Sequence, residues 1–201
     1  MTYRRAGVDI DEQNRAIRLF ASAVKETHDQ RVLGGPGTFG ALFDISALDV
    51  EEPVLVSSMD GIGTKTYVAA QANYFSGLGA DIVNHCVNDI LAQGARPLFF
   101  LDYFAASRLN AQQAADVVNS AAQACKENEC ALVGGEIAEM PDVYNEGQID
   151  VVGAIVGVVS KSAMLPTTGV GPGDLIVGLV SDGLHTNGYT LARRALLDVG
   201  G

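Results

Sequence analysis

The sequence lacks the features that mark a membrane, nucleic-acid-binding or disulfide-bonded protein. Its 13 Lys and Arg residues face 24 Asp and Glu residues, and the net charge of −11 argues against nucleic acid or anionic lipid as a general partner. The longest apolar run, VVGAIVGVV at 151–159, is too short to cross a bilayer. The N-terminal stretch MTYRRAGVDIDEQ has no apolar block after its charges, so it does not predict a secretory signal.

Cysteine is scarce as well. The chain has three, Cys86, Cys125 and Cys130, and no two of them form a CxxC pair. An odd number without a paired motif predicts reduced thiols rather than a disulfide framework or a metal site. We therefore expect a cytoplasmic protein.

The composition is otherwise that of a globular protein, with 48% hydrophobic and 18% charged residues, enough to bury a sizeable core. Apolar spacing and turn residues predict helices at 9–28, 64–72, 78–93 and 111–128, and strands at 53–58, 97–105, 130–135 and 150–159. This loose alternation predicts an α/β (α+β) domain with a mixed sheet. The near-continuous apolar run of the last strand predicts burial on both of its faces.

A domain boundary is predicted in the stretch 165–174, which is dense in Pro, Gly and Thr. Residues 1–168 form the first domain. Residues 169–201 hold a predicted strand at 175–181 and a predicted helix at 186–200, too little to bury a core alone. They either dock on the first domain or begin a second one. We favour the start of a second α/β domain that is mostly missing.

The motif DGIGTK at 60–65 has the residue types that hold phosphate. Gly61 and Gly63 let backbone N–H groups converge on an oxyanion, and the following helix points its N-terminus at the same place. Thr64 offers a hydroxyl group and Lys65 a positive charge. Asp60 would repel phosphate unless a divalent cation lay between them, which is how Mg²⁺ binds. A plain glycine turn with a capping Asp or Thr is the alternative.

Three further carboxylates favour the metal–nucleotide interpretation. Asp89 follows Asn88 in a predicted helix, Asp44 closes FGALFD, and Glu136 follows a predicted strand and the pair Gly134–Gly135. A carboxylate behind a strand commonly lies at a sheet end, where ligands bind. Each one alone could be a cap or a surface charge.

Two histidines have different contexts. His85 shares a helix face with Asp81 and Asp89 at i, i+4 spacing, so a metal site is conceivable, but we favour a structural histidine. His185 lies in SDGLHTNGYT, a small, polar loop that suits an acid or base near neutral pH. Thr186 and Asn187 could bind ribose or phosphate oxygens, cap the final helix, or do both.

Together, DGIGTK, VNDILAQGARPLFFLDYFA, LVGGEIAEMPDVY and SDGLHTNGYTLARR resemble the phosphoribosylformylglycinamidine cyclo-ligase (aminoimidazole ribonucleotide synthetase) family of purine biosynthesis. YRRAGVDID and GGPGTFGALFD fit as well, and the motifs keep their order from Tyr3 to the last residue. The main departure is length, because the family has a second α/β domain of similar size. Ile62, where valine is usual, is a conservative change.

The resemblance implies an ATP-dependent ring closure. ATP phosphorylates the formyl amide oxygen of formylglycinamidine ribonucleotide, and an amidine nitrogen then closes the imidazole of 5-aminoimidazole ribonucleotide, giving ADP and phosphate. Lys65 and His185 are the implied catalytic residues, and His185, Thr186 and Asn187 would bind substrate. The implied Mg²⁺ ligands come from Asp60, Asp89, Asp44 and Glu136. The implied ATP-binding residues are Gly37, Phe39, Gly40, Asp60, Gly61, Gly63, Thr64, Lys65, Asn88, Asp89, Gly134, Gly135 and Glu136.

The resemblance also implies a homodimer whose first domains pair strands into a shared barrel, with ATP near that interface. A small-molecule kinase, a selenophosphate-type synthetase or the preceding amidotransferase of the pathway are alternatives of the same fold. A selenophosphate-type synthetase would require a reactive cysteine near the N-terminal glycine loop, and none of the three cysteines lies there. A truncated dimerisation domain without catalysis is the remaining alternative.

Overall fold

The computed structural model describes residues 7–34, 39–165 and 169–198, and within them one four-stranded sheet dominates. Its strands lie in the order β1 (Pro53–Gly61), β4 (Ile149–Ser160), β2 (Arg96–Ala106) and β3 (Ala131–Glu139). β4 is antiparallel to β1 and β2, whereas β2 and β3 are parallel. The predicted mixed sheet is therefore confirmed.

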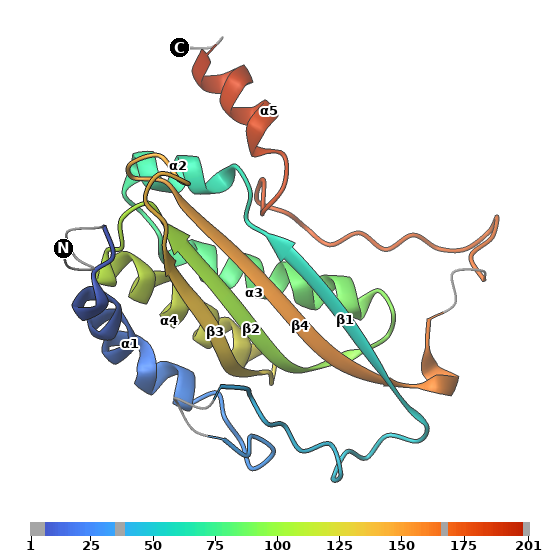
Figure 1. Cartoon of the computed structure of the whole chain (residues 1–201). Helices are drawn as coiled ribbons and strands as arrows, with labels where there is room; N and C mark the ends of the chain where they lie inside the picture. Colours follow the sequence, from blue (N-terminus) through green and yellow to red (C-terminus); the bar gives the residue numbers. More distant parts are fainter. Residues whose placement is uncertain (1–6, 35–38, 166–168, 199–201) are drawn as a thin grey trace.

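The helices of the domain are α1 (Ile10–Lys25), α2 (Lys65–Ala72), α3 (Ser76–Leu91) and α4 (Ala111–Glu127). α3 and α4 pack together behind the sheet, and α1 lies beside α4 at the β3 edge (Figure 1). The core between helices and sheet contains Ile82, Phe100, Phe104, Val118 and Ile155, all at most 2% exposed. All eight elements predicted before residue 161 form, with ends that differ by at most four residues.

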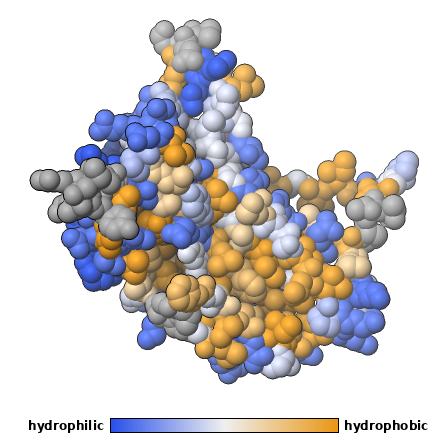
Figure 2. Space-filling model, viewed as in Figure 1, coloured by the Kyte–Doolittle hydropathy of each residue, from blue (hydrophilic) through white to orange (hydrophobic). Residues whose placement is uncertain are grey.

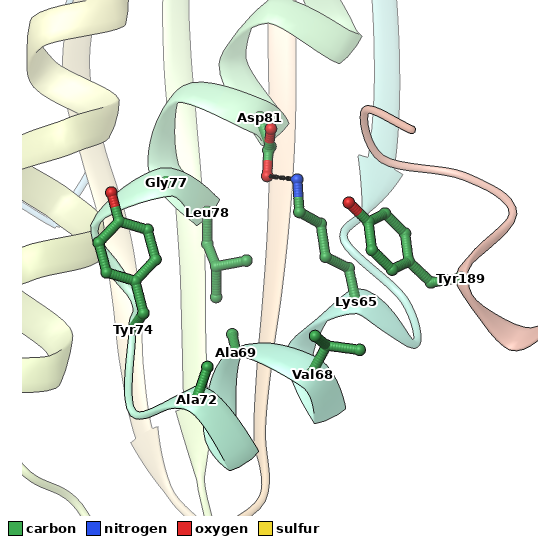
Figure 3. A pocket seen from close by; sticks show the side chains of 9 residues that line it. All are labelled: Lys65, Val68, Ala69, Ala72, Tyr74, Gly77, Leu78, Asp81 and Tyr189. Atoms are coloured by element: carbon green, nitrogen blue, oxygen red, sulfur yellow. Dashed lines mark ion pairs between the residues drawn. The ribbon is translucent and has the colours of Figure 1, made fainter. Parts of the chain in front are cut away.

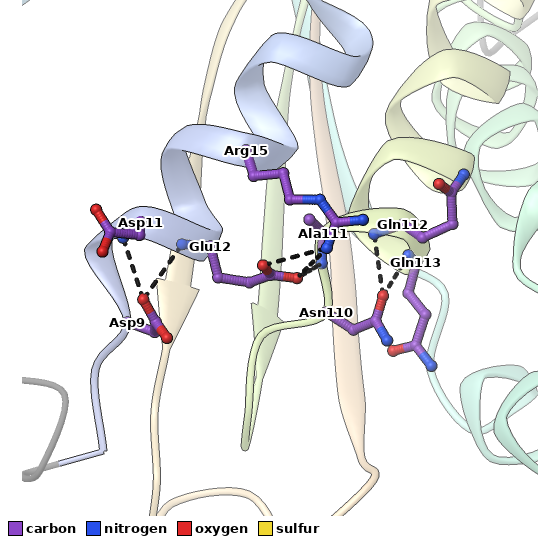
Figure 4. Close-up of polar contacts among 8 residues, drawn as sticks. All are labelled: Asp9, Asp11, Glu12, Arg15, Asn110, Ala111, Gln112 and Gln113. Atoms are coloured by element: carbon purple, nitrogen blue, oxygen red, sulfur yellow. Dashed lines mark hydrogen bonds and ion pairs between the residues drawn. The ribbon is translucent and has the colours of Figure 1, made fainter.

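Polar side chains fix where α1 and α4 begin (Figure 4). Asp9 caps α1 by accepting from the backbone N–H groups of the first turn, and Asn110 caps α4 in the same way. The two starts are joined because Glu12 accepts a 2.8 Å hydrogen bond from the backbone N–H of Ala111. Glu139 at the end of β3 accepts from the backbone N–H of Asp9 as well. The acidic residues of this corner thus have structural partners.

The face of the sheet that points away from α3 and α4 is apolar and open. Leu55 and Met59 of β1 are 57% and 71% exposed, and Leu101 of β2 is 37% exposed. Figure 2 shows hydrophobic residues gathered over these strands. β4 alternates buried and half-buried positions, so the prediction that it is buried on both faces was wrong. The apolar side chains of β4 point to both faces of the sheet. Helices of the described chain cover only one of these faces, so the side chains on the other face are half-buried.

The C-terminal segment differs from the prediction. The predicted strand at 175–181 does not form, and Ile176, Leu179 and Val180 are at least 92% exposed. A strand needs a neighbour for its backbone N–H and C=O groups, and among the described residues this segment pairs with no other. The predicted helix at 186–200 begins three residues later, as α5 (Tyr189–Arg193), and continues as a π-helical turn, η3 (Arg194–Asp198); residues 199–201 lie outside the described residues. A short 3-10 turn, η2 (Lys161–Ala163), follows β4.

Candidate metal and nucleotide site

Three side chains that could ligate a cation converge where β1 crosses α3. Ligand atoms of Asp60, His85 and Asp89 lie within 4.8 Å of one another. His85 Nε2 is 2.7 Å from Asp60 Oδ2, and Ser58 Oγ donates a 2.6 Å hydrogen bond to Asp89 Oδ2. Two carboxylate groups this close together can both ligate one hard divalent cation. We call these three residues the Asp60 cluster.

The secondary structure explains this convergence. Ser58 and Asp60 are two residues apart on a strand, so both side chains point to the face covered by α3. His85 and Asp89 are four residues apart on α3 and therefore share the face that meets β1. Asp60 is the penultimate residue of β1, although the sequence predicted it at the start of a turn. The strand thus fixes the direction of its carboxylate.

Asp60 is held in its ionised form. The backbone N–H of Gly61 donates to Asp60 Oδ1 at 2.6 Å and is the main cause that lowers the pKa of Asp60 below its usual value. Burial opposes this shift, and the neighbouring His85 supports it. The carboxylate is 42% exposed, so it can still meet a ligand from solvent.

The turn after β1 brings Lys65 to α3, where it meets Asp81 (Figure 3). Ile62 is 2% exposed and its backbone N–H donates to Val151 O, which anchors the turn in the core. Gly63 has a φ of +64°, a conformation that favours glycine. Lys65, the first residue of α2, forms an ion pair with Asp81 of α3. Lys65 of α2 therefore lies beside α3, and α3 also carries His85 and Asp89.

The His185 loop contacts this turn. Lys65 Nζ donates a 2.6 Å hydrogen bond to the backbone oxygen of His185, and Thr64 Oγ1 is 2.8 Å from Thr190 Oγ1. The imidazole of His185 is 70% exposed. Thr186 is buried and Asn187 is exposed, and neither caps α5, which follows Gly188. The capping interpretation of these two residues was therefore wrong.

The structure places the other predicted site residues elsewhere. Asn88 is exposed next to Asp89 on α3, while Phe39 and Gly40 are exposed in the loop after α1. Gly37 lies outside the described residues. Asp44 and Glu136 do not belong to the Asp60 cluster. Gly134, Gly135 and Glu136 lie within β3, at the opposite edge of the sheet from β1, so the prediction that Glu136 follows a strand was wrong.

Sequence reasoning missed three contributors to this site. His85 was taken as a structural histidine, yet it contacts Asp60. Ser58 was given no part, and Asp81 was named only as a conceivable metal ligand beside His85, yet Ser58 contacts Asp89 and Asp81 contacts Lys65. The i, i+4 spacing of Asp81, His85 and Asp89 was the available signal, but Asp81 contacts Lys65 of α2 whereas His85 and Asp89 contact residues of β1.

Comparison with known proteins shows the family. Residues 41–159 match the family model described as "AIR synthase related protein, N-terminal domain". The chain belongs to this family. This AIR synthase related chain is 50% identical over 198 residues to the phosphoribosylformylglycinamidine cyclo-ligase of Anaeromyxobacter sp. (strain Fw109-5), and 48% identical over 200 residues to that of Carboxydothermus hydrogenoformans. These alignments cover 98% and 100% of the chain, which confirms the resemblance.

The chain spans about 58% of the length of these curated relatives. Solved structures share its fold at lower identity. E. coli HypE matches with a TM-score of 0.58 and 19% identity over 75% of this chain and 44% of its own. Thiamine-monophosphate kinase from Stenotrophomonas maltophilia K279a matches with a TM-score of 0.56 and 17% identity, over 73% and 43% of the two chains. None of the helices formed by the described residues has the length and apolar character needed to span a membrane.

Proposed function

We propose that this chain supplies the nucleotide- and metal-binding part of a phosphoribosylformylglycinamidine cyclo-ligase. The observation that carries the proposal is the convergence of Asp60 and Asp89 beside the glycine turn that ends in Lys65. The cyclo-ligase names of relatives at about 50% identity support it. A HypE of the same fold was solved in complex with ATP, which supports a nucleotide as the ligand.

The residues of the Asp60 cluster fit Mg²⁺. Asp60 and Asp89 offer carboxylate oxygens, the ligands that this hard cation prefers, and both have exposed surface. His85 contacts Asp60 Oδ2 and would orient that carboxylate rather than ligate the ion itself. The bound cation would neutralise negative charge between these carboxylates and the phosphates of ATP.

The turn supplies the positive side of the phosphate site. Gly63 is exposed, whereas the Gly61 N–H already donates to Asp60, and α2 begins at Lys65 directly after the Thr64 hydroxyl. Lys65 would exchange its present partners, Asp81 and the His185 carbonyl, for phosphate oxygens. Because Lys65 contacts both α3 and the His185 loop, phosphate bound here would lie next to that loop.

The chemistry follows from these positions. The γ-phosphoryl group of ATP moves to the formyl amide oxygen of formylglycinamidine ribonucleotide, and the β–γ bridge oxygen leaves with ADP. The amidine nitrogen then attacks the activated carbon, the ring closes, and phosphate departs. Such reactions depend mainly on alignment and charge neutralisation. The exposed imidazole of His185 would accept the amidine proton, with Thr186 and Asn187 binding the substrate.

A homodimer is part of the proposal. The open sheet face, with Leu55, Met59 and Leu101 exposed, is the kind of apolar surface that a second copy would cover. Asp44 and Glu136 lie outside the Asp60 cluster and would complete a metal site only as contributions from a second copy. The division at residue 168, with a second domain beginning at 169, is likewise a proposal, supported by the nearly full exposure of Ile176 and Val180.

The alternatives have less support. A related kinase or synthetase of the same fold is disfavoured because the similar curated proteins are cyclo-ligases. A dimerisation domain without catalysis would not need Asp60, His85 and Asp89 to converge. A cytoplasmic location is proposed because Cys86, Cys125 and Cys130 are buried as free thiols, which suits a reducing compartment.

Calorimetry with Mg·ATP tests the proposal directly. The chain should bind ATP in the presence of Mg²⁺, and a double Asp60→Asn, Asp89→Asn variant should not. Asp116→Asn, on the outer side of α4, removes the same charge elsewhere and is the matched control. Equal binding by the double variant and the control would show that these carboxylates do not form the site.

A further inference from the structure

A small cavity lies between α2 and α3, beside the turn that ends in Lys65 (Figure 3). Its volume is about 190 Å³. A pocket that encloses a whole drug-sized ligand has roughly 300 Å³ or more, so this cavity can take only part of a substrate. Its lining is mostly apolar, with an aromatic ring on either side. The apolar residues include Val68 and Ala69 of α2 and Leu78 of α3, and the rings belong to Tyr74 and Tyr189.

The charged groups of this cavity are Lys65 and Asp81, which form an ion pair. Each of the two side chains is 20% exposed. Asp81 Oδ2 is itself buried, and among the described residues it accepts no hydrogen bond beyond this ion pair. A carboxylate oxygen shielded from water in this way depends on its cation, because burying a charge without a partner is costly. The cavity therefore needs a positive charge next to Asp81.

Lys65 is not committed to Asp81. Its Nζ also donates a 2.6 Å hydrogen bond to the backbone oxygen of His185 and lies 5.2 Å from the centroid of the Tyr189 ring. When Lys65 turns to the phosphates of ATP, as the proposed function requires, Asp81 loses its cation. Removing one partner of a buried ion pair is strongly unfavourable, because an uncompensated charge remains. A second cation should therefore replace Lys65 when the site is filled.

We propose that this second cation is the amidine group of formylglycinamidine ribonucleotide, and that Asp81 selects the amidine over an amide. The inference rests on the function proposed above, and it assigns a substrate-binding role to Asp81. An amidine is a strong base that is positively charged near neutral pH. It is planar and presents N–H groups from two nitrogens, as does the guanidinium group of Arg, which pairs well with carboxylates.

The position of Asp81 suits the ring closure. One amidine nitrogen carries the ribose and closes the ring, and the other becomes the amino group of 5-aminoimidazole ribonucleotide. Asp81 would bind the second nitrogen, so the first remains free to attack the activated carbon. Leu78, which is 2% exposed, lines the cavity next to this carboxylate and would lie against the forming ring. The lining thus matches a small planar group with one polar edge.

The amidine site lies next to the Asp60 cluster without belonging to it. Asp81 is four residues before His85 on α3, and it is not one of the three residues whose ligand atoms converge. Residues at this spacing have Cβ atoms about 5–6 Å apart on the same face of a helix. A substrate whose amidine is bound by Asp81 could therefore extend its formyl oxygen toward a phosphate held at the Asp60 cluster.

Calorimetry with two ribonucleotides tests the assignment. Formylglycinamide ribonucleotide differs from the amidine only by a carbonyl oxygen in place of the terminal nitrogen, so it lacks the positive charge. The chain should bind the amidine at least about tenfold tighter than the amide, since a hydrogen bond to a charged group contributes that much. Asp81→Asn should weaken amidine binding about tenfold or more and bring the two affinities within about threefold. Asp116→Asn on α4 removes the same charge elsewhere and should keep the preference.

Mg·ATP binding by the same chains separates this inference from its rivals. Asp81→Asn should leave the affinity for Mg·ATP within about threefold or raise it, because Lys65 loses a competing partner. A loss as large as that of Lys65→Met would mean that Asp81 only positions Lys65, and would overturn the inference. Equal binding of the two ribonucleotides, or binding of neither by a chain that binds Mg·ATP, also overturns it and leaves the nucleotide site standing. Failure of the chain to bind Mg·ATP would instead refute the proposed function.

The comparison of the two ribonucleotides on the unaltered chain needs no variant, so it holds whatever the substitution does to folding. Circular dichroism checks that Asp81→Asn is folded. Asp81→Glu keeps the negative charge and should retain a preference for the amidine, whereas a structural role of Asp81 predicts no preference in any of these chains.

Discussion

Asp60 and Asp102 are the same residue type, on the same face and in the same row of one sheet, on either side of Gly153 of β4, yet their surroundings are opposite. Asp60 lies at the β1 edge, where the Gly61 N–H and His85 lower its pKa. Asp102 lies under α1 and α4, where burial raises its pKa to about 7. The first is an ionised, partly exposed group suited to a cation, and the second is a carboxyl group that desolvation keeps partly protonated near pH 7. The Gly61 N–H at the end of β1 is the main cause at Asp60, whereas burial is the main cause at Asp102.

The largest expected effect comes from removing the charge at the exposed end of this row. Asp60→Asn should lower the affinity for Mg·ATP about 100-fold, or roughly 2.7 kcal/mol, because a charge-assisted ligand is lost. Titration calorimetry measures this change, with Asp116→Asn as the control of equal charge. An affinity within twofold of the parent would mean that Asp60 does not contribute to the site.

At the half-buried end of the row, Asp102, the expected effect is on stability. The pKa of Asp102 is raised in the folded chain to about 7, above the unfolded value of about 3.9. Stability is therefore lost as the pH rises through this window, because the unfolded chain ionises first. Asp102→Asn avoids this loss and should stabilise the chain by about 2 kcal/mol at pH 8, with little effect near pH 4. Urea unfolding at both pH values measures it, and an equal change at both would contradict the assignment.

The residue between the two aspartates tests how tightly the row is packed. At Gly153 a Cβ atom would lie 2.2 Å from Phe100 Cζ and 2.8 Å from Ile82 Cγ1. Gly153→Ala should therefore destabilise the chain by about 2 kcal/mol, because the core must shift to accept one methyl group. Thermal unfolding measures the loss. Gly178→Ala, where no atom lies within 4 Å, is the control and should change stability by less than about 0.5 kcal/mol.

The smallest change in Mg·ATP affinity is expected at Lys65, the lysine near the Asp60 end of the row. Lys65→Met should weaken Mg·ATP binding about tenfold, since one of several phosphate contacts is lost. His185→Ala should leave that affinity within about twofold, because this exposed imidazole is assigned to the substrate. A larger effect of His185→Ala than of Lys65→Met on Mg·ATP binding would reverse the two roles.

The sequence predicted the packed domain well. The spacing of apolar residues and the positions of turn residues located every strand and helix between residues 10 and 160, because the spacing of apolar residues follows the buried face of each element. The predicted strand at 175–181 failed for the same reason. Its residues are apolar, but pairing depends on a neighbouring strand that an apolar pattern does not supply, and these residues remain exposed.

The site was predicted in part. The motif pointed to Asp60 and Lys65 because glycine turns and charged residues are visible in one short stretch. The partners His85 and Asp81 depend on how α3 crosses β1, which is tertiary information. Asp102 was not singled out at all. Its environment is formed by α1 and α4, which lie far away in the sequence, and by Gly135. Only the structure shows that a side chain at position 135 would collide with Asp102.

The central claim is that the exposed end of the row, the Asp60 cluster, is where the metal and nucleotide bind. Paramagnetic broadening by Mn²⁺ in the presence of ATP tests it most directly, because Mn²⁺ takes the same oxygen ligands as Mg²⁺. We predict that the NMR resonances of Gly61, His85 and Asp89 broaden first. Broadening that begins elsewhere, or that leaves His85 sharp while ATP is bound, would contradict the account.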